Sequence, residues 1–109
     1  MYQPGEVLLI PFPFSDLAAS KRRPVLVLTS PDSRGDFTCL AITSQVQRQQ
    51  AVPLTQDDMQ KGTLPKASWI RTTKVYTLSV DLVVSRFGRL TTERFRSAHA
   101  DFCQHFGCC

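Results

Sequence analysis

The sequence contains no apolar run long enough to span a membrane, and its N-terminus lacks the features of a secretory signal peptide. The first residues, MYQPGEVLLIPF, have neither a basic opening segment nor a small-residue cleavage site. We therefore expect a cytoplasmic protein. Its 109 residues, 42% hydrophobic and 20% charged, predict a single globular domain over residues 1–109.

Histidine is scarce, and the common catalytic motifs are missing. The sequence has no Walker loop, GxGxxG, HExxH or nucleophile elbow. The only histidines, His99 and His105, fall at or beyond the margin of the apolar stripe of a predicted helix, where solvated side chains are expected. A hydrolytic triad is therefore poorly supported.

The four cysteines do not form a zinc motif. Cys39 lies in an apolar run and is predicted to be a small core residue. Cys103, Cys108 and Cys109 lack CxxC spacing, and in the cytoplasm we expect them to stay reduced. No metal site and no cofactor are expected.

Acidic residues are fewer than basic ones. Nine Asp and Glu against 13 Lys and Arg give a net charge of +4, which favours a polyanionic partner if the cations share one face.

Short apolar runs bounded by proline, glycine and polar turns predict a mainly β protein. The predicted strands cover residues 5–12, 24–30, 37–45, 51–55, 67–78 and 81–90, the fifth in two pieces. We expect a long loop over 11–23 and one helical turn over 56–62.

The pattern changes period at the C-terminus. Phe95, Ala98, Phe102 and Phe106 recur at offsets of three and four, which predicts an amphipathic helix over 91–106, with Thr91 or Thr92 as its N-cap. Short strands followed by one helix suggest a compact barrel, because closure removes exposed strand edges.

A basic run, Lys21, Arg22 and Arg23, stands directly before Pro24 and an apolar strand. The residue before a proline is held extended, so Arg23 projects from a defined backbone. Thr43, Ser44 and Gln45 end the next strand, and if the two strands pair, the Arg23 guanidinium and the Thr43 hydroxyl can reach one mouth and bind a phosphate there. The alternatives are a solvated basic turn and a hydroxyl that bonds only its own turn.

A second basic group surrounds an aromatic residue. Lys66, Arg71 and Lys74 flank Trp69, and Arg86 and Arg89 flank a later strand end. Cations interleaved with an aromatic ring suit single-stranded nucleic acid, although a tryptophan is more often a core residue.

Four segments in this order, GEVLLIPFPFSDLAASKRRPVLVL, AITSQ, LPKASWIRTTKVYTL and VSRFGRLTTERF, resemble the MazF/PemK family of toxin endoribonucleases of type II toxin–antitoxin modules, in its PemK-like branch. The resemblance implies an SH3-like small barrel of five to seven strands with a C-terminal helix, usually a homodimer. It also implies metal-independent, sequence-selective cleavage of single-stranded RNA to 2′,3′-cyclic phosphate and 5′-OH ends. The implied partners are a cognate antitoxin and, through it only, operator DNA.

The resemblance assigns catalysis to Arg23, which stands where the family has its catalytic arginine, and to Thr43, which opens the family's T-[TSA]-Q motif. Arg23 would neutralise the phosphorane and protonate the leaving oxygen, and Thr43 would bind a non-bridging oxygen. The expected RNA contacts are Lys21, Arg22, Ser44, Gln45, Lys66, Ser68, Trp69, Arg71 and Lys74.

The sequence departs from better-known members at acidic positions. Ala18 stands in place of a glutamate, with Asp16 the nearest carboxylate, and Ser68-Trp69 stand in place of Asp-Gln. No general base is therefore identified. A non-catalytic nucleic-acid- or protein-binding SH3-like module, a decayed toxin, is the alternative, and a metal-dependent nuclease is a more distant one.

Overall fold

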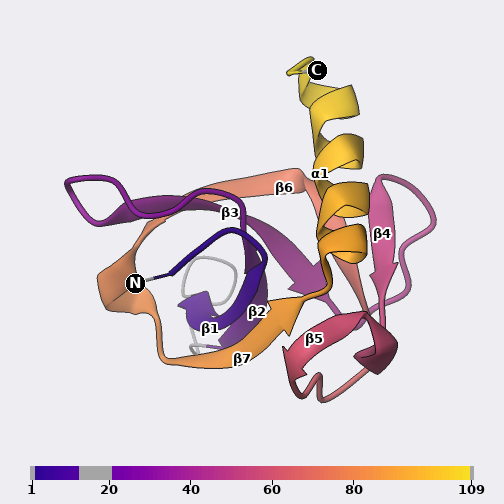
Figure 1. Cartoon of the computed structure of the whole chain (residues 1–109), viewed down its shortest axis with the longest axis horizontal. Coiled ribbons are helices and arrows are strands. Elements are labelled where there is room, and N and C mark those ends of the chain that lie inside the picture. The colour runs from indigo at the N-terminus through magenta and orange to yellow at the C-terminus, as the bar shows by residue number, and fades with distance from the viewer. Residues whose placement is uncertain (1, 13–20, 109) are drawn as a thin grey trace.

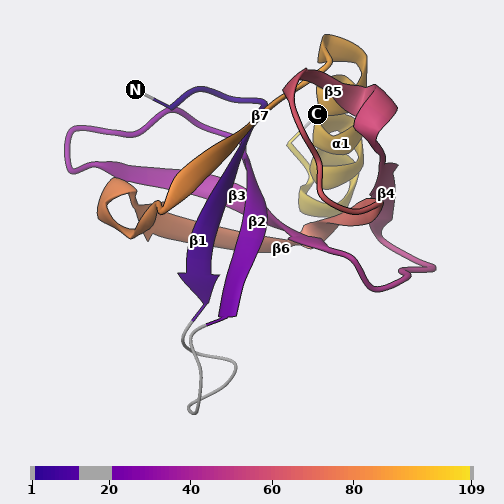
Figure 2. The same ribbon diagram turned by 90° about the horizontal axis from the view of Figure 1, so that it is seen from below.

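The computed structural model describes residues 2–12 and 21–108. The strands are β1 (Glu6–Phe12), β2 (Lys21–Val27), β3 (Asp36–Thr43), β4 (Ala51–Leu54), β5 (Met59–Gly62), β6 (Ser68–Ser79) and β7 (Ser85–Leu90), followed by one helix, α1 (Thr92–Phe106). All strand pairs are antiparallel, in the order β4-β6-β3-β2-β1-β7-β5. The sheet curls strongly, and α1 lies near β4 and β6 (Figures 1 and 2). The mainly β fold with a C-terminal helix is confirmed.

The basic run belongs to a strand and not to a loop. We expected the second strand to begin at Pro24, but β2 begins at Lys21. The reason is that β1 continues to Phe12, so that Pro11 pairs with Arg22 and Phe12 with Lys21. The ends of the predicted loop over 11–23 are therefore strand residues, and its residues 13–20 lie outside the described part of the chain.

Three other predicted elements differ in extent. Over 56–62 only Gln56–Asp58 is helical, and the rest is β5, because pairing with β7 prevails over the local helical signal. The two pieces predicted within 67–78 form one strand, β6, whose register shifts opposite Leu40 and Ala41. Within 81–90 a 3₁₀ turn, Val80–Leu82, precedes a shorter strand that continues through Gly88 to Leu90.

The central strands are buried on both faces, which explains their unbroken apolar runs. One face packs on α1 through a cluster that includes Leu26, Ile42 and Ile70. The other face lines the inside of the curl with a second cluster that includes Val25 and Cys39. Cys39 is fully buried, as predicted, and burial raises the pKa of its thiol to about 12, so the thiol is neutral and unreactive at physiological pH.

Side-chain bonds fix both the start and the middle of α1. Thr91 is the N-cap, as predicted, and its Oγ1 accepts a hydrogen bond of 3.2 Å from the Arg94 amide. The buried Thr72 of β6 donates a hydrogen bond to Asp101. Phe106 does not join the buried stripe and is 52% exposed, because the end of α1 extends beyond the sheet (Figure 1).

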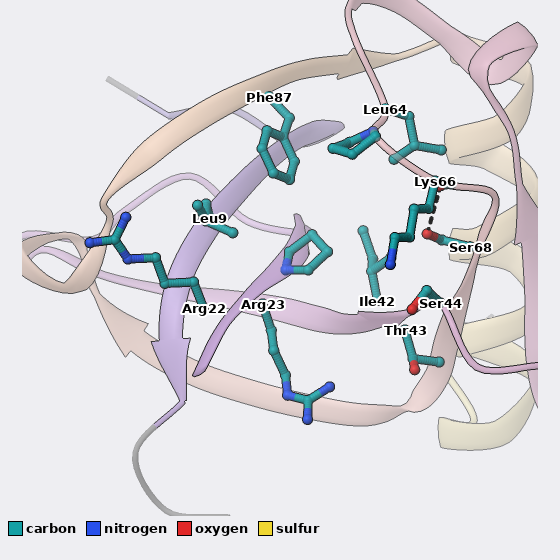
Figure 3. A pocket seen from close by; sticks show the side chains of 12 residues that line it. Leu9, Arg22, Arg23, Ile42, Thr43, Ser44, Leu64, Lys66, Ser68 and Phe87 are labelled. Carbon is teal, nitrogen blue, oxygen red and sulfur yellow. Dashed lines mark hydrogen bonds between the residues drawn. The ribbon is translucent and has the colours of Figure 1, made fainter. Parts of the chain in front are cut away.

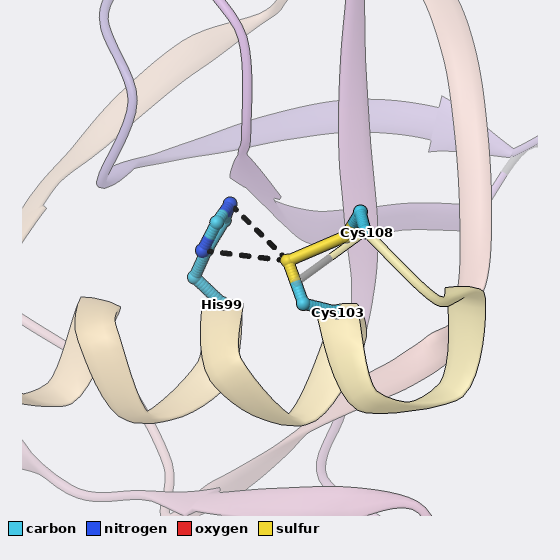
Figure 4. Close-up of a disulfide and its surroundings, with 3 residues drawn as sticks. All are labelled: His99, Cys103 and Cys108. Atoms are coloured by element: carbon cyan, nitrogen blue, oxygen red, sulfur yellow. Dashed lines mark hydrogen bonds between the residues drawn. A yellow bond between two sulfur atoms is a disulfide. The ribbon is translucent and has the colours of Figure 1, made fainter.

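The prediction of reduced C-terminal cysteines is wrong for two of them. Cys103 and Cys108 form a disulfide, with Cα atoms 4.8 Å apart, beside His99 (Figure 4). Gly107 ends the helix with a positive φ of 70° and turns the chain so that Cys108 returns to Cys103. Cys109 lies outside the described residues. Across residues 2–12 and 21–108, no helix has the length and apolar character needed to cross a bilayer.

Candidate active site

A cleft of about 220 Å³ opens where the start of β2 and the end of β3 meet the connection between β5 and β6. Figure 3 shows the side chains around it. The lining residues are Leu9, Arg22, Arg23, Pro24, Ile42, Thr43, Ser44, Leu64, Pro65, Lys66, Ser68 and Phe87. The floor is apolar, and the rim carries cations and hydroxyls. This composition suits a ligand that has flat rings to pack on the floor and a charged backbone to contact the rim.

Strand register places Arg23 opposite Thr43. Val25 of β2 pairs with Ala41 of β3, and counting two residues outward in this antiparallel pair brings Arg23 to the level of Thr43. Thr43 pairs in turn with Trp69, and Trp69 with Pro53 of β4. Residues at one level of neighbouring strands share a face of the sheet, so Arg23, Thr43 and Trp69 lie in one row across three adjacent strands.

The hydroxyl of Thr43 is held in place with its hydrogen available. Its Oγ1 accepts a hydrogen bond of 3.1 Å from the Gln45 amide, which leaves the O–H free to donate to a ligand oxygen. Ser68 is buried and donates to the Lys66 carbonyl at 2.9 Å, which fixes the backbone that carries the Lys66 side chain (Figure 3). The site is therefore partly ordered before any ligand arrives.

The described lining is positive and unneutralised. Arg22, Arg23 and Lys66 line the cleft, and none of them forms an ion pair with another described residue. The described lining contains no carboxylate and no imidazole. In the described ranges, no group of three or more His, Cys, Asp or Glu side chains is placed to hold a metal ion. The cleft is thus suited to binding an anion through arginine, lysine and hydroxyl donors.

The other predicted site residues divide into two groups. Arg22, Ser44, Lys66 and Ser68 line the cleft, although the Arg22 guanidinium points away from the other labelled polar groups in Figure 3. Gln45, Trp69, Arg71 and Lys74 do not line it. Trp69 is half-buried and adjoins the cleft through its pairing with Thr43, and Arg71 lies two residues further along β6.

Three of the positions considered from sequence cannot be placed in the cleft. The side chain of Lys21 is not described, and Asp16 and Ala18 lie outside the described residues.

The sequence did not reveal the apolar floor. Phe87 reaches the cleft because β7 pairs with β1, and Leu64 arrives from the connection that follows β5. Apolar residues in a short strand indicate burial, but they give no sign of which neighbour they will cover.

The sequence matches, over residues 3–106, the family described as the PemK-like, MazF-like toxin of type II toxin–antitoxin systems. The chain belongs to this family. No protein of curated function matches the sequence.

Solved structures share the family fold at low sequence identity. MazF from Deinococcus radiodurans is 15% identical, with 97% of this chain and 96% of that chain covered and a TM-score of 0.75. The Mycobacterium tuberculosis toxin MazF-mt6 is 21% identical, with 94% and 96% covered and a TM-score of 0.71. A mycobacterial endoribonuclease in complex with its cognate antitoxin is 17% identical, with 98% and 96% covered and a TM-score of 0.72. The curled sheet and C-terminal helix are thus the architecture of MazF toxins.

Proposed function

We propose that this MazF/PemK-family chain, a single domain over residues 1–109, is a toxin that cleaves single-stranded RNA at selected sequences without a metal ion. The observation that carries the proposal is the cleft in which Arg23, which has no ion-pair partner among residues 2–12 and 21–108, stands at the level of Thr43. Its support from relatives is that neighbours of the same fold are endoribonucleases. A guanidinium and a hydroxyl at one level of neighbouring strands can together bind the two non-bridging oxygens of a phosphodiester.

In the proposed reaction, the ribose 2′-oxygen forms a bond to the adjacent phosphorus and the bond to the 5′-oxygen breaks. The products are a 2′,3′-cyclic phosphate and a 5′-OH. Arg23 stabilises the extra negative charge of the phosphorane and donates a proton to the leaving oxygen, and Thr43 donates a hydrogen bond to a non-bridging oxygen. The described lining offers no carboxylate or imidazole to take the 2′-OH proton, so that proton passes to water.

The wider RNA surface follows from the same placement. Lys66, Ser44 and Ser68 contact the nucleotide in the cleft, and Arg22 and Lys21 attract the strand from the rim. Trp69 offers a stacking surface beside Thr43, and Arg71, Lys74 and Gln45 contact the RNA beyond it.

We also propose that the protein is a homodimer in the cytoplasm and that a cognate antitoxin inhibits it. It would contact operator DNA only through that antitoxin. The support is that MazF from Deinococcus radiodurans and a mycobacterial relative are found in complexes with antitoxins. An acidic antitoxin segment would complement the positive rim of the cleft.

The experiment that tests the proposal incubates the purified protein with a long single-stranded RNA, with and without EDTA, and maps the product ends. Cleavage at a short recurring sequence in EDTA, with cyclic phosphate and 5′-OH ends, is expected. Loss of cleavage in EDTA would contradict the metal-independent reaction. Salt-dependent RNA binding with no product would instead favour the non-catalytic binding module.

Two substitutions at Thr43 distinguish the contribution of its hydroxyl to cleavage from that of its side-chain shape. Thr43→Val removes the donor and is expected to slow single-turnover cleavage roughly 100-fold, the usual effect of losing one transition-state donor. Thr43→Ser keeps the hydroxyl and should stay within about tenfold of wild type. The RNA affinity of both variants should change little, because the hydrogen bond strengthens only as charge develops on the phosphate. Equal rates for the valine and serine variants would remove Thr43 from the mechanism.

A further inference from the structure

A second group of cations lies outside the cleft, where β1, β7 and β5 are neighbours in the sheet (Figure 1). Lys61, Arg86 and Arg89 line a hollow of about 330 Å³ together with Gln3, Glu6 and Gly88. None of these residues lines the candidate active site. Three cations therefore surround one hollow that contains a single carboxylate.

Two of these cations face each other at an energetic cost. Lys61 of β5 pairs directly with Arg89 of β7, and like charges opposite each other on an antiparallel pair are destabilising. Glu6 pairs with Arg89 from the other side, but its carboxylate binds the Nε of Arg86 at 2.6 Å. The repulsion between Lys61 and Arg89 is thus left without a neutralising carboxylate among the described residues.

Other contacts hold the two guanidiniums in position. The Glu6 side chain is only 8% exposed and also accepts a hydrogen bond of 2.7 Å from the Gln3 amide, so it anchors Arg86 from below. Arg86 stacks on the Tyr2 ring at 5.0 Å. Arg89 donates to the Gln3 side-chain oxygen at 2.8 Å. Each guanidinium uses one edge for these contacts and has donors left for an incoming anion.

The hollow continues into a neighbouring one, and such an extended surface is suited to a polymeric ligand. A second hollow shares Gln3 and Arg89 with the first and continues past Leu90 to Thr92 at the start of α1. On its other side, β7 contributes Phe87 to the candidate active site. A strand of RNA leaving the cleft across β7 would therefore reach the second group of cations.

We propose that Lys61, Arg86 and Arg89 form a second phosphate-binding site, which holds the backbone of the RNA strand beyond the scissile nucleotides. The proposal rests on the function proposed above and extends it to the length of RNA that is bound. The successive phosphates of an RNA strand can contact all three cations at once. A ligand with a single carboxylate would need only one guanidinium.

The test compares binding of a short and a several-fold longer single-stranded 2′-O-methyl RNA, which lacks the attacking hydroxyl and stays intact. The variant is Lys61→Gln/Arg89→Gln, because removing Arg86 would leave the buried Glu6 unpaired. Its control, Arg34→Gln/Arg96→Gln, removes two exposed charges from the β2–β3 turn and α1. Fluorescence anisotropy over a range of salt concentrations gives the affinity, and thermal unfolding checks that both variants fold.

We expect Lys61→Gln/Arg89→Gln to weaken binding of the long RNA about tenfold and to lower its salt slope by about 1.4, two phosphate contacts on a single strand. Binding of the short RNA and the control variant should match wild type. If the variant matches its control on long RNA while wild type still binds and cleaves, this proposal alone is overturned. If wild type binds neither RNA, both proposals fail. If Lys61→Gln/Arg89→Gln weakens binding of a polyglutamate peptide but not of RNA, the three cations bind an acidic protein partner and the proposed RNA site is overturned.

Discussion

Arg23→Ala is expected to reduce RNA cleavage by about 1,000-fold or more, the largest effect of any single substitution in the cleft. The side chain carries a fixed positive charge at the level of Thr43 and has no ion-pair partner among the described residues, so its charge is available to the phosphorane. Single-turnover cleavage of an RNA containing the preferred sequence measures the loss. Growth arrest on expression in cells should disappear in parallel.

The same position allows a test of geometry as well as charge. Arg23→Lys keeps the charge but loses the planar fork that binds two oxygens, so a rate between those of wild type and Arg23→Ala is expected. Arg34→Ala, on an exposed turn, is the matched control and should leave the rate unchanged. Stability should change little in every case, because the Arg23 side chain forms no hydrogen bond or ion pair with another described residue. A folded Arg23→Ala variant with wild-type activity would remove the proposed mechanism.

Gly62→Ala is expected to lower the free energy of unfolding by about 3 kcal/mol, from overpacking together with backbone strain. Gly62 has a positive φ of 86°, and a Cβ there would collide with the backbone carbonyl of Phe87 on the facing strand. A backbone atom of β7 cannot move aside as a flexible side chain can, because β7 also pairs with β1. Either β5 separates from β7 or both strands shift. Urea denaturation followed by circular dichroism measures the change.

Gly107→Ala is the matched control for that substitution. Gly107 also has a positive φ, of 70°, but no heavy atom lies within 4 Å of the added Cβ. Only the left-handed backbone strain remains, which costs about 1–2 kcal/mol. If the two variants are equally stable, the close approach of β5 and β7 does not constrain the fold.

Much of the candidate site was predictable because its elements are local in sequence. Arg23 stands before Pro24, and Thr43 ends an apolar run, so each was expected at a strand end facing one mouth. The pairing of β2 with β3 brings the two to one level, and their catalytic roles remain predictions. Trp69, also expected near the RNA, pairs with Thr43 on the neighbouring strand but does not line the cleft.

Two errors arose where strand pairing or a turn conformation overrode the expectation from local sequence. The sequence predicted a polar loop at Lys21, Arg22 and Arg23, yet pairing with residues 10–12 of β1 makes them part of a strand. The disulfide of Cys103 depends on the left-handed turn at Gly107, which brings Cys108 back onto the helix end. The first outcome depends on residues about ten positions away, and the second on the conformation of a single glycine between the two cysteines.

The sequence by itself determined the strands other than β5, the helix with a threonine N-cap, and the basic residue fixed before Pro24, because these depend on side-chain periodicity and on the backbone limits of neighbouring residues. The tertiary structure alone decided the register that places Arg23 opposite Thr43, the apolar floor that Phe87 and Leu64 complete, and the opposition of Lys61 to Arg89. Register depends on which faces of distant strands are buried together. A shift of one residue would turn each of these side chains to the other face of the sheet.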